Sequence, residues 1–352
     1  IILYFPLGTG LLSMDSKLTI IDIARLANVS PSAVSFAIND RKGISDATRE
    51  KILRIIEEHN FVPNQQARRL LLNYTNNIAV LHELHKSPLV QLFHMDIITS
   101  ALSKSEYLGY NFVFSPVNES QNGEIPEIVK NKDVDGIIVL GEVSGKIIEK
   151  IEKVKVPFVI IDEHLKTKNA VAIEADYHHG ARLAAEYLIE KSHTNIAYIG
   201  ESREKAYGKQ TLSGFRDQLK EMGKALPAKN IKDEAENAEE DSGRKCMEKL
   251  LRLKTLPSAV FCVADIYAIG ALKAIKAAGL KVPRDISLMG MDNIILSSYI
   301  EPPLTTIKFH KGNMGYTAIE TLVSMIKGEY AGPKKIMFDG EIVERDSVRA
   351  LK

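Results

Sequence analysis

The chain has 352 residues, of which 45% are hydrophobic and 26% charged, and its formal net charge is only +1. This composition is that of an ordinary globular protein with room for two or three domains, and it excludes a disordered chain or a bundle of membrane spans. The two cysteines, Cys246 and Cys262, form no C-x-x-C pattern. We therefore expect inert packing residues in a reducing compartment.

Residues 1–13 have neither the basic start nor the small-residue cleavage pattern of a signal peptide. Their apolar run, Ile1 to Leu7, is too short to span a membrane. We expect this segment to be an expression remnant or the product of a misassigned start, with Met14 as the natural first residue.

Thr19 to Asn39 predicts two short helices joined by a tight turn. Thr19 and Asp22 have the spacing of a capping box, and Ser30 followed by Pro31 suits the start of the second helix. Apolar residues recur at helical spacing in both segments, and a third helix, Asp46 to His59 with Ser45 as its cap, can close a small core. This pattern is typical of a helix-turn-helix DNA-binding unit.

The predicted second helix has an apolar face and an opposite, outer face. At about 100° per residue, Phe36 lies about 200° and Ser32 about 160° from Val34, which heads the apolar stripe with Ala37. We predict that Phe36 points outward and contacts a thymine methyl group in the major groove. A packing position in the core or a dimer contact is the alternative interpretation.

The rest of the chain alternates short apolar runs with helical stretches. Expected strands are 78–81, 112–114, 137–140, 158–161, 196–199, 259–263 and 287–289, and expected helices are 90–107, 178–191, 242–253 and 267–278. The fold class is therefore α/β. Two series of alternating elements predict two doubly wound lobes with parallel sheets, and a ligand between them at the carboxyl ends of the strands.

Polar residues follow several of the expected strands, and these are the candidates for ligand contact. They are His82, Glu83, His85, Glu142, Asp162, Glu163, Asp265 and Asp292. Residues at such positions also cap helices or brace loops, so each one has a structural alternative.

Neither His82 and His85 nor His178 and His179 have the spacing of a known metal cage, and no nucleophile, phosphate-loop or dinucleotide motif is present. We predict no metal, no cofactor and no enzymatic activity.

Several segments resemble the lactose-repressor (LacI/GalR) family of bacterial transcription regulators. In the head and hinge these are 19–39, 45–52, 60–64 and 67–70, and in the body 135–140, 156–162, 270–272, 282–287, 302–306 and 344–347. The resemblance implies a helix-turn-helix head at 14–62, a hinge helix and linker at 63–76, and a two-lobed effector-binding and dimerisation domain of the periplasmic-binding-protein type at 77–352.

The resemblance also implies which residues meet DNA. The DNA-binding set is Thr19, Arg25, Ser30, Pro31, Ser32, Ala33, Ser35, Phe36, Asn39, Asn64, Ala67, Arg68 and Leu70. Arg25, Arg41, Lys42, Arg68 and Arg69 would hold phosphates, and Leu70 stands where relatives wedge a leucine into the minor groove, ordinary packing being the alternative. Arg69 and Leu71 depart from the common Ser and Lys or Arg.

Two departures concern the effector. Thr211 replaces an arginine, and Ala264-Asp265 replaces Asn-Asp, whereas Asp292 keeps the first acid of the family's Gly-aromatic-Asp-Asp element. Threonine cannot replace the guanidinium fork of that arginine, which leaves three alternatives. The effector is not a sugar or phosphosugar held in the standard way, or the site binds no effector. Otherwise the positive charge comes from a shifted position, namely Arg203, Lys205 or Lys209. The effector-binding set is His82, Glu83, Glu142, Asp162, Lys205, Thr211, Asp265 and Asp292.

The resulting prediction is a cytoplasmic, ligand-responsive repressor that binds a palindromic operator in double-stranded DNA as a homodimer, without membrane contact. A dimer is expected because no heptad tail follows Ser347. The alternatives are a periplasmic solute-binding protein, which would need a secretory signal and no DNA-binding head, and an α/β enzyme.

Overall fold

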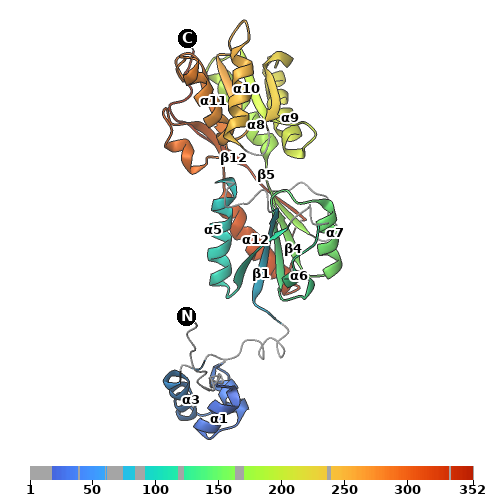
Figure 1. Ribbon diagram of the computed structural model, residues 1–352, viewed down its shortest axis with the longest axis vertical. Coiled ribbons are helices and arrows are strands. Elements are labelled where there is room, and N and C mark those ends of the chain that lie inside the picture. The colour runs from blue at the N-terminus through green and yellow to red at the C-terminus, as the bar shows by residue number, and fades with distance from the viewer. Residues whose placement is uncertain are drawn as a thin grey trace, which may run out of the picture. The chain divides into compact units, whose positions relative to one another are not determined.

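The computed structural model describes residues 18–38, 40–59, 61, 74–83, 92–117, 123–162, 170–235, 239–332 and 334–351. The chain divides into two compact units, Ile1–Tyr74 and Thr75–Lys352. Figure 1 shows the helices and strands of both units. The predictions for residues 1–13, for Asn39, and for Asn64, Ala67, Arg68 and Leu70 in the hinge lie outside the described residues.

In the first unit the described residues form α1 (Ile20–Ala27), α2 (Pro31–Ile38) and α3 (Asp46–Glu58). These helices share one small core, made of Ile23, Ala24, Ala27, Val34, Ala37, Ile52 and Phe61. The expected apolar stripes of the three helices are therefore confirmed, although Ile38, Ile55 and Ile56 are only partly buried.

The first sheet of the second unit has the order β11-β5-β4-β3-β1-β2, with every recorded pairing parallel. Its strands are β1 (Asn77–Glu83), β2 (Asn111–Val117), β3 (Gly136–Leu140), β4 (Phe158–Ile161), β5 (Val171–Ala175) and β11 (Lys335–Phe338). Helices α5 (Leu92–Tyr107) and α12 (Lys311–Ile326) pack together over one face, and α6 (Glu127–Lys130) and α7 (Gly145–Val154) belong to the other (Figure 1).

The second sheet has the order β12-β10-β9-β8-β6-β7, and only β12 among its recorded pairings runs antiparallel. Its strands are β6 (Ile196–Glu201), β7 (Ile231–Ala235), β8 (Ala259–Cys262), β9 (Ser287–Met291), β10 (Thr305–Phe309) and β12 (Gly340–Val343). The helices are α8 (Tyr177–Glu190), α9 (Ala206–Glu221), α10 (Glu240–Leu251) and α11 (Asp265–Ala277), with short 3₁₀ turns η3 (Ala228–Asn230) and η4 (Ile295–Ser298).

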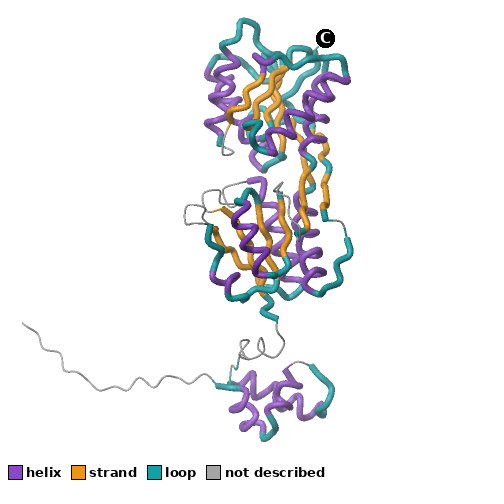
Figure 2. The backbone as a smooth tube through the Cα atoms, turned by 90° about the vertical axis from the view of Figure 1, so that its right-hand side faces the viewer, coloured by secondary structure: helices purple, strands orange, loops and turns teal. Residues whose placement is uncertain are grey.

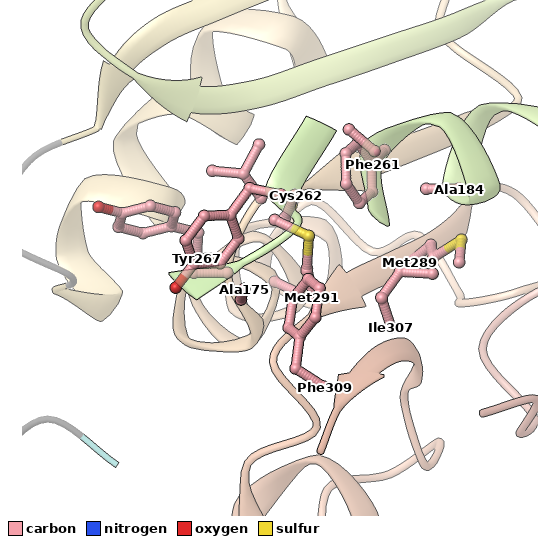
Figure 3. Close-up of a cluster of buried hydrophobic side chains, with 14 of the residues drawn as sticks. Ala175, Ala184, Phe261, Cys262, Tyr267, Met289, Met291, Ile307 and Phe309 are labelled. Atoms are coloured by element: carbon pink, nitrogen blue, oxygen red, sulfur yellow. The ribbon is translucent and has the colours of Figure 1, made fainter. Parts of the chain in front are cut away.

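The chain passes from one sheet to the other after β5, β10 and β11, and the strands beside these connections run together along one side of the unit (Figure 2). One continuous apolar core reaches across both lobes. Figure 3 shows part of it, where Tyr267, Met291 and Phe309 gather with Ala175. The predicted α/β fold with two doubly wound lobes is confirmed.

All seven strands expected from apolar runs are present, and so are the expected helices. The sequence analysis missed β5, β7, β10, β11 and β12 together with α6, α7, α9 and α12. Cys246 and Cys262 are buried and unpaired, as expected, and burial raises the pKa of both thiols. Among the described residues, no helix has the length and apolar character needed to cross a membrane.

Helices α10 and α11 approach closely because glycines stand at their contact. A Cβ atom on Gly270 would lie 1.9 Å from the Glu240 carbonyl oxygen, and one on Gly243 would lie 2.2 Å from the Tyr267 carbonyl oxygen. Backbone cannot yield as a flexible side chain does, so any larger residue must push the two helices apart.

We therefore expect Gly270→Ala to lower the free energy of unfolding by about 1–3 kcal/mol or more. The matched control is Gly312→Ala in α12, where nothing lies within 4 Å of an added Cβ. That change should be neutral or raise stability by up to about 1 kcal/mol. Urea unfolding of the full chain measures both, and equal stability of the two variants would contradict the close approach.

Candidate functional site

The turn between α1 and α2 is built by the predicted caps. The Thr19 and Asp22 side chains form a complete capping box at the start of α1. Asn28 ends α1 in the left-handed conformation with φ 53°, and the Ser30 hydroxyl accepts a hydrogen bond from Ala33 N at 3.2 Å. The predicted roles of Thr19 and Ser30 as helix caps are confirmed, and they fix the angle at which α2 leaves the turn.

The C-terminal end of α2 is held by an arginine that the sequence analysis did not single out. Arg49 in α3 donates hydrogen bonds to the carbonyl oxygens of Phe36 (3.2 Å), Ala37 (3.4 Å) and Arg41 (2.6 Å). The Phe36 and Ala37 carbonyl oxygens lie in the last turn of α2 and have no partner within the helix, and a cation is favourable beside them. Arg49 therefore fixes α2 against α3.

The outer face of α2 presents the predicted base-reading residues. Pro31 and Ser32 are exposed, and Ala33, Ser35 and Phe36 are partly buried. Ser30 and Thr19 are also exposed, and Arg25 is exposed beside Asp22 at 3.4 Å.

Phe36 is not part of the buried core, as predicted, but it does not point freely outward. Its ring packs beside Gly43, where an added Cβ would lie 2.9 Å from Phe36 Cε2. The position of Phe36 outside the core agrees with the predicted helix phase, and the loop after α2 covers part of the ring. Base contact by Phe36 stays a prediction.

In the second unit, the predicted Asp162 joins the two lobes. It follows β4 with φ 58°, accepts a hydrogen bond from the Tyr177 hydroxyl and lies 2.9 Å from Nε2 of His94. Tyr177 is the first residue of α8, and its ring packs edge-on against Tyr207 of α9 at 4.6 Å between centroids and against Phe309 at 5.2 Å. Asp162 thus connects α5 and β4 of one lobe with α8 of the other.

A second group of polar side chains surrounds the start of α9. The Glu201 carboxylate accepts a hydrogen bond of 2.8 Å from Tyr267 and lies 3.3 Å from the Lys205 ammonium group. The same ammonium group is 3.9 Å from Glu142, which follows β3 in the other lobe. The predicted residues Lys205 and Glu142 are therefore brought together.

Asp292 lies in the turn after β9 at φ 112°, and only 9% of its surface is exposed. Burial raises the pKa of Asp292 well above its usual range, and the neighbouring Asp265 raises it further, whereas Lys311 opposes the shift. No described residue donates a hydrogen bond to its carboxylate. Among the described residues, no hydrogen-bond donor therefore favours the charged form of this carboxyl group, and Lys311 is the group that opposes the upward shift of its pKa.

The predicted effector contact of Asp265 is wrong, because this residue is fully buried and braces a loop. Its carboxylate accepts hydrogen bonds from the Thr306 hydroxyl at 2.6 Å and from Ile294 N at 2.9 Å. Burial raises the pKa of Asp265 to about 7, against the lowering effect of these two hydrogen bonds.

The predicted effector contact of Thr211 is wrong for a similar reason. Thr211 is fully buried within α9, and its hydroxyl pairs with Tyr198 at 2.8 Å and with the Tyr207 carbonyl oxygen at 2.9 Å. A side chain with no exposed surface and a satisfied hydroxyl group cannot reach a ligand.

His82 and Glu83 end β1 and are both buried. The His82 ring nitrogen Nδ1 lies 3.2 Å from the Glu83 carbonyl oxygen, and Glu83 Oε2 has no hydrogen-bond partner. No three His, Cys, Asp or Glu side chains within the described ranges are arranged to hold a metal ion.

The sequence analysis missed Tyr177, Tyr207, Glu201 and His94. Glu201 ends β6 and was detectable as a strand-end acid. Tyr177 follows β5, a strand that was itself missed, so no sequence signal marked it.

Comparison with known proteins gives a consistent result. Residues 19–64 match the lacI family of bacterial regulatory proteins, and residues 185–348 match the periplasmic binding protein-like domain. The chain is 33% identical over 338 residues to the HTH-type transcriptional repressor PurR of Vibrio vulnificus (strain CMCP6), covering 95% of this chain and 99% of that protein. It is 31% identical over 340 residues to the ribose operon repressor of Haemophilus influenzae, with the same coverage.

Solved structures are also similar to the fold. The Lac repressor dimer bound to operator and the anti-inducer ONPF superimposes with a TM-score of 0.81 at 25% identity, covering 95% of this chain and 100% of that chain. The transcriptional regulator CelR–cellobiose complex gives a TM-score of 0.70 at 26% identity, covering 94% and 99%.

We predict that Asp265→Ala lowers the free energy of unfolding by about 2–4 kcal/mol, because the Thr306 hydroxyl and Ile294 N–H would be left buried without acceptors. The exposed Asp133→Ala is the control and should change it by less than about 0.5 kcal/mol. Thermal and urea unfolding of the full chain test this.

The pH dependence gives a second readout. Because the folded-state pKa of Asp265 is about 7 and that of an unfolded aspartate about 3.9, the folded state binds the extra proton between these values. Its contribution to stability therefore falls as pH rises from about 4 to 7, and Asp265→Ala should flatten this part of the profile. An unchanged slope would contradict the assignment.

Proposed function

Because the chain belongs to the lacI family of bacterial regulatory proteins, we propose that it is a repressor that binds a palindromic operator as a homodimer and is controlled by a small molecule. It is a DNA-binding transcription regulator and not an enzyme. The observation that carries the proposal is the helix-turn-helix unit, in which the Ser30 cap and the Arg49 hydrogen bonds hold α2 with its outer face accessible. The same chain contains a two-lobed second unit.

In this proposal α2 lies in the major groove. Ser32, Ala33 and Phe36, with Pro31, contact base edges, while Arg25, Arg41 and Lys42 contact phosphates. Their exposure, complete or partial, supports these roles. The remaining members of the set, Thr19, Ser30, Ser35 and Asn39, would support the turn or contact the backbone of the operator.

The hinge belongs to the proposal through the resemblance alone. Asn64, Ala67, Arg68 and Leu70 would form a short helix on DNA, with Leu70 opening the central step from the minor groove. The effector would be held in the two-lobed unit by side chains at the strand ends. Two of the similar proteins point to sugars, one by its name as a ribose operon repressor and the other by its complex with cellobiose.

The second candidate, a periplasmic solute-binding protein, shares the two-lobed body. The helix-turn-helix head argues against it, since a solute-binding protein has no use for a DNA-reading unit. A regulator works where its operator is, so the proposal places the protein in the cytoplasm.

Selection of binding sequences from a random double-stranded DNA pool tests the proposal. The full chain should enrich a palindromic sequence, and binding measured by gel shift should weaken steeply with salt. A chain that enriches no sequence, or only a sequence without two-fold symmetry, would contradict the proposal.

On the selected operator, Phe36→Ala should relax base preference within the half-site and leave the salt dependence of binding unchanged, because an aromatic ring neutralises no phosphate. Arg68→Ala should weaken binding to all sequences alike and reduce the salt slope by about one unit. Equal losses on every sequence with unchanged slopes would remove Phe36 from the groove.

The homodimer gives a further prediction. Helices α5 and α12 pack side by side and expose apolar groups, among them Leu102, Tyr316 and Tyr107, whose exposed fraction is 83%. We expect light scattering to report a dimer, and Leu102→Glu combined with Tyr107→Glu to give a monomer. A stable tetramer would contradict the predicted dimer, and a double variant that stays dimeric would contradict this interface.

A further inference from the structure

Carboxylates from both lobes converge near the connections between the sheets. Asp162 comes from the first lobe, and Glu201 and Asp292 come from the second. Asp292 N donates a hydrogen bond to the Ile307 carbonyl oxygen at 2.8 Å, and Phe309, two residues further along β10, packs against Tyr177 at 5.2 Å between ring centroids. The Tyr177 hydroxyl group in turn donates to Asp162. The rings of Tyr177 and Tyr207 pack against each other at 4.6 Å between centroids, with Tyr207 at the start of α9, shortly after Glu201. Burial raises the pKa of both hydroxyl groups, and Asp292 raises both further.

The basic side chains near these acids are already engaged. Lys205 is shared between Glu201 and Glu142. The Lys311 ammonium group lies 3.0 Å from Asp96, and Arg203 pairs with Asp233. Lys205, Lys311 and Arg203 thus each have a carboxylate partner other than Asp292, His94 lies 2.9 Å from Asp162, and Thr211 contributes no charge.

Two of the buried carboxylates have unused acceptor capacity. Asp292 is nine-tenths buried, and no described side chain or backbone N–H donates to it. Glu83, which is 8% exposed at the carboxyl end of β1, has one oxygen with no hydrogen-bond partner. Burying a carboxylate without hydrogen-bond donors costs free energy. A buried carboxylate of this kind in a two-lobed unit is therefore suited to accept a hydrogen bond from a bound ligand.

Aromatic rings complete the surroundings. The rings of Phe93 and Tyr207 are partly buried beside Tyr177. The Lys311 ammonium group already lies 5.5 Å from the Phe93 ring centroid, so this environment accommodates a cation over a ring. The tyrosine hydroxyl groups remain protonated at neutral pH, because their pKa values are raised.

We propose that the effector carries a protonated amine, which Asp292 binds with Asp162 or Glu201 nearby, while its uncharged part lies against Tyr207 and Phe93. This inference rests on the proposed function, since it names the chemical class of the small molecule. An effector with a phosphate or carboxylate group is disfavoured, because it would bring an anion beside the Asp292 carboxyl group.

The test uses probes of matched shape and different charge on the full chain at about pH 6.5, where aliphatic amines are protonated. The pairs are glucosamine against glucose and glucose 6-phosphate, and putrescine against butane-1,4-diol. We expect at least one amine to raise the melting temperature by several degrees and to surpass its neutral and anionic partners. The inference is overturned if no amine stabilises the protein, or if glucose, its phosphate or the diol does so equally well.

Variants add a second measurement, the melting temperature of the free protein, which requires no probe. Asp292→Asn should raise the melting temperature of the free protein, because an amide cannot carry the charge that burial disfavours at this position, and it should weaken binding of the stabilising amine by about 10–100-fold. Glu201→Gln keeps a hydrogen-bond acceptor for Tyr267 and should weaken binding of the amine less than Asp292→Asn does. The exposed Asp133→Asn should leave both quantities unchanged, and full amine affinity in folded Asp292→Asn would overturn the inference.

Gel shifts on the selected operator, made with the same preparations, separate this inference from the proposed function. If a neutral sugar changes operator affinity and amines do not, the regulator stands and the amine inference fails. If amines stabilise the protein but no DNA is bound, the amine site stands and the proposed repressor fails.

Discussion

The second unit depends on the passage of its chain between two sheets after β5, β10 and β11. As a result α12 and β11, which cover and extend the first sheet, are made from chain that lies between β10 and β12 of the second sheet. Neither lobe can complete its core from one continuous stretch of sequence. Aromatic side chains fill the place where the connections meet, with Phe309 packed against Phe93 and Tyr177, and join the lobes into one apolar core.

The acids at this meeting place differ in what they do, and their hydrogen bonds distinguish them. Asp265 has donors for its carboxylate and holds the loop after β9 to β10. Asp162 has partners in both lobes and therefore ties α8 to α5. Asp292 has burial without donors. Since a satisfied carboxylate stabilises a fold and an unsatisfied one destabilises it, Asp292 is the one of these three acids that has the character expected of a binding group.

Local signals predicted the head well, because caps and helical spacing act within a few residues of one another. The central strands were also predictable, since buried parallel strands are apolar throughout. Strand β7 was missed because it lies at a sheet edge and reads Ile-Lys-Asp-Glu-Ala, and β5 because it contains Glu174. That glutamate is buried against Lys335 of β11, a partner distant in sequence. The direction of Thr211 toward Tyr198 likewise depends on packing that no spacing reveals.

The hydrogen bonds from Arg49 to the end of α2 have a consequence for how this protein could come to bind a different DNA sequence. The helix is held by its backbone carbonyls and by Val34 and Ala37 beneath it, whereas Pro31, Ser32 and Phe36 do not belong to the core. The residues that hold the helix and the residues proposed to contact bases are thus separate sets. If the proposed contacts are correct, substitutions at these contact positions cost little folding stability, so DNA sequence preference can diverge between copies of the gene while the architecture stays constant.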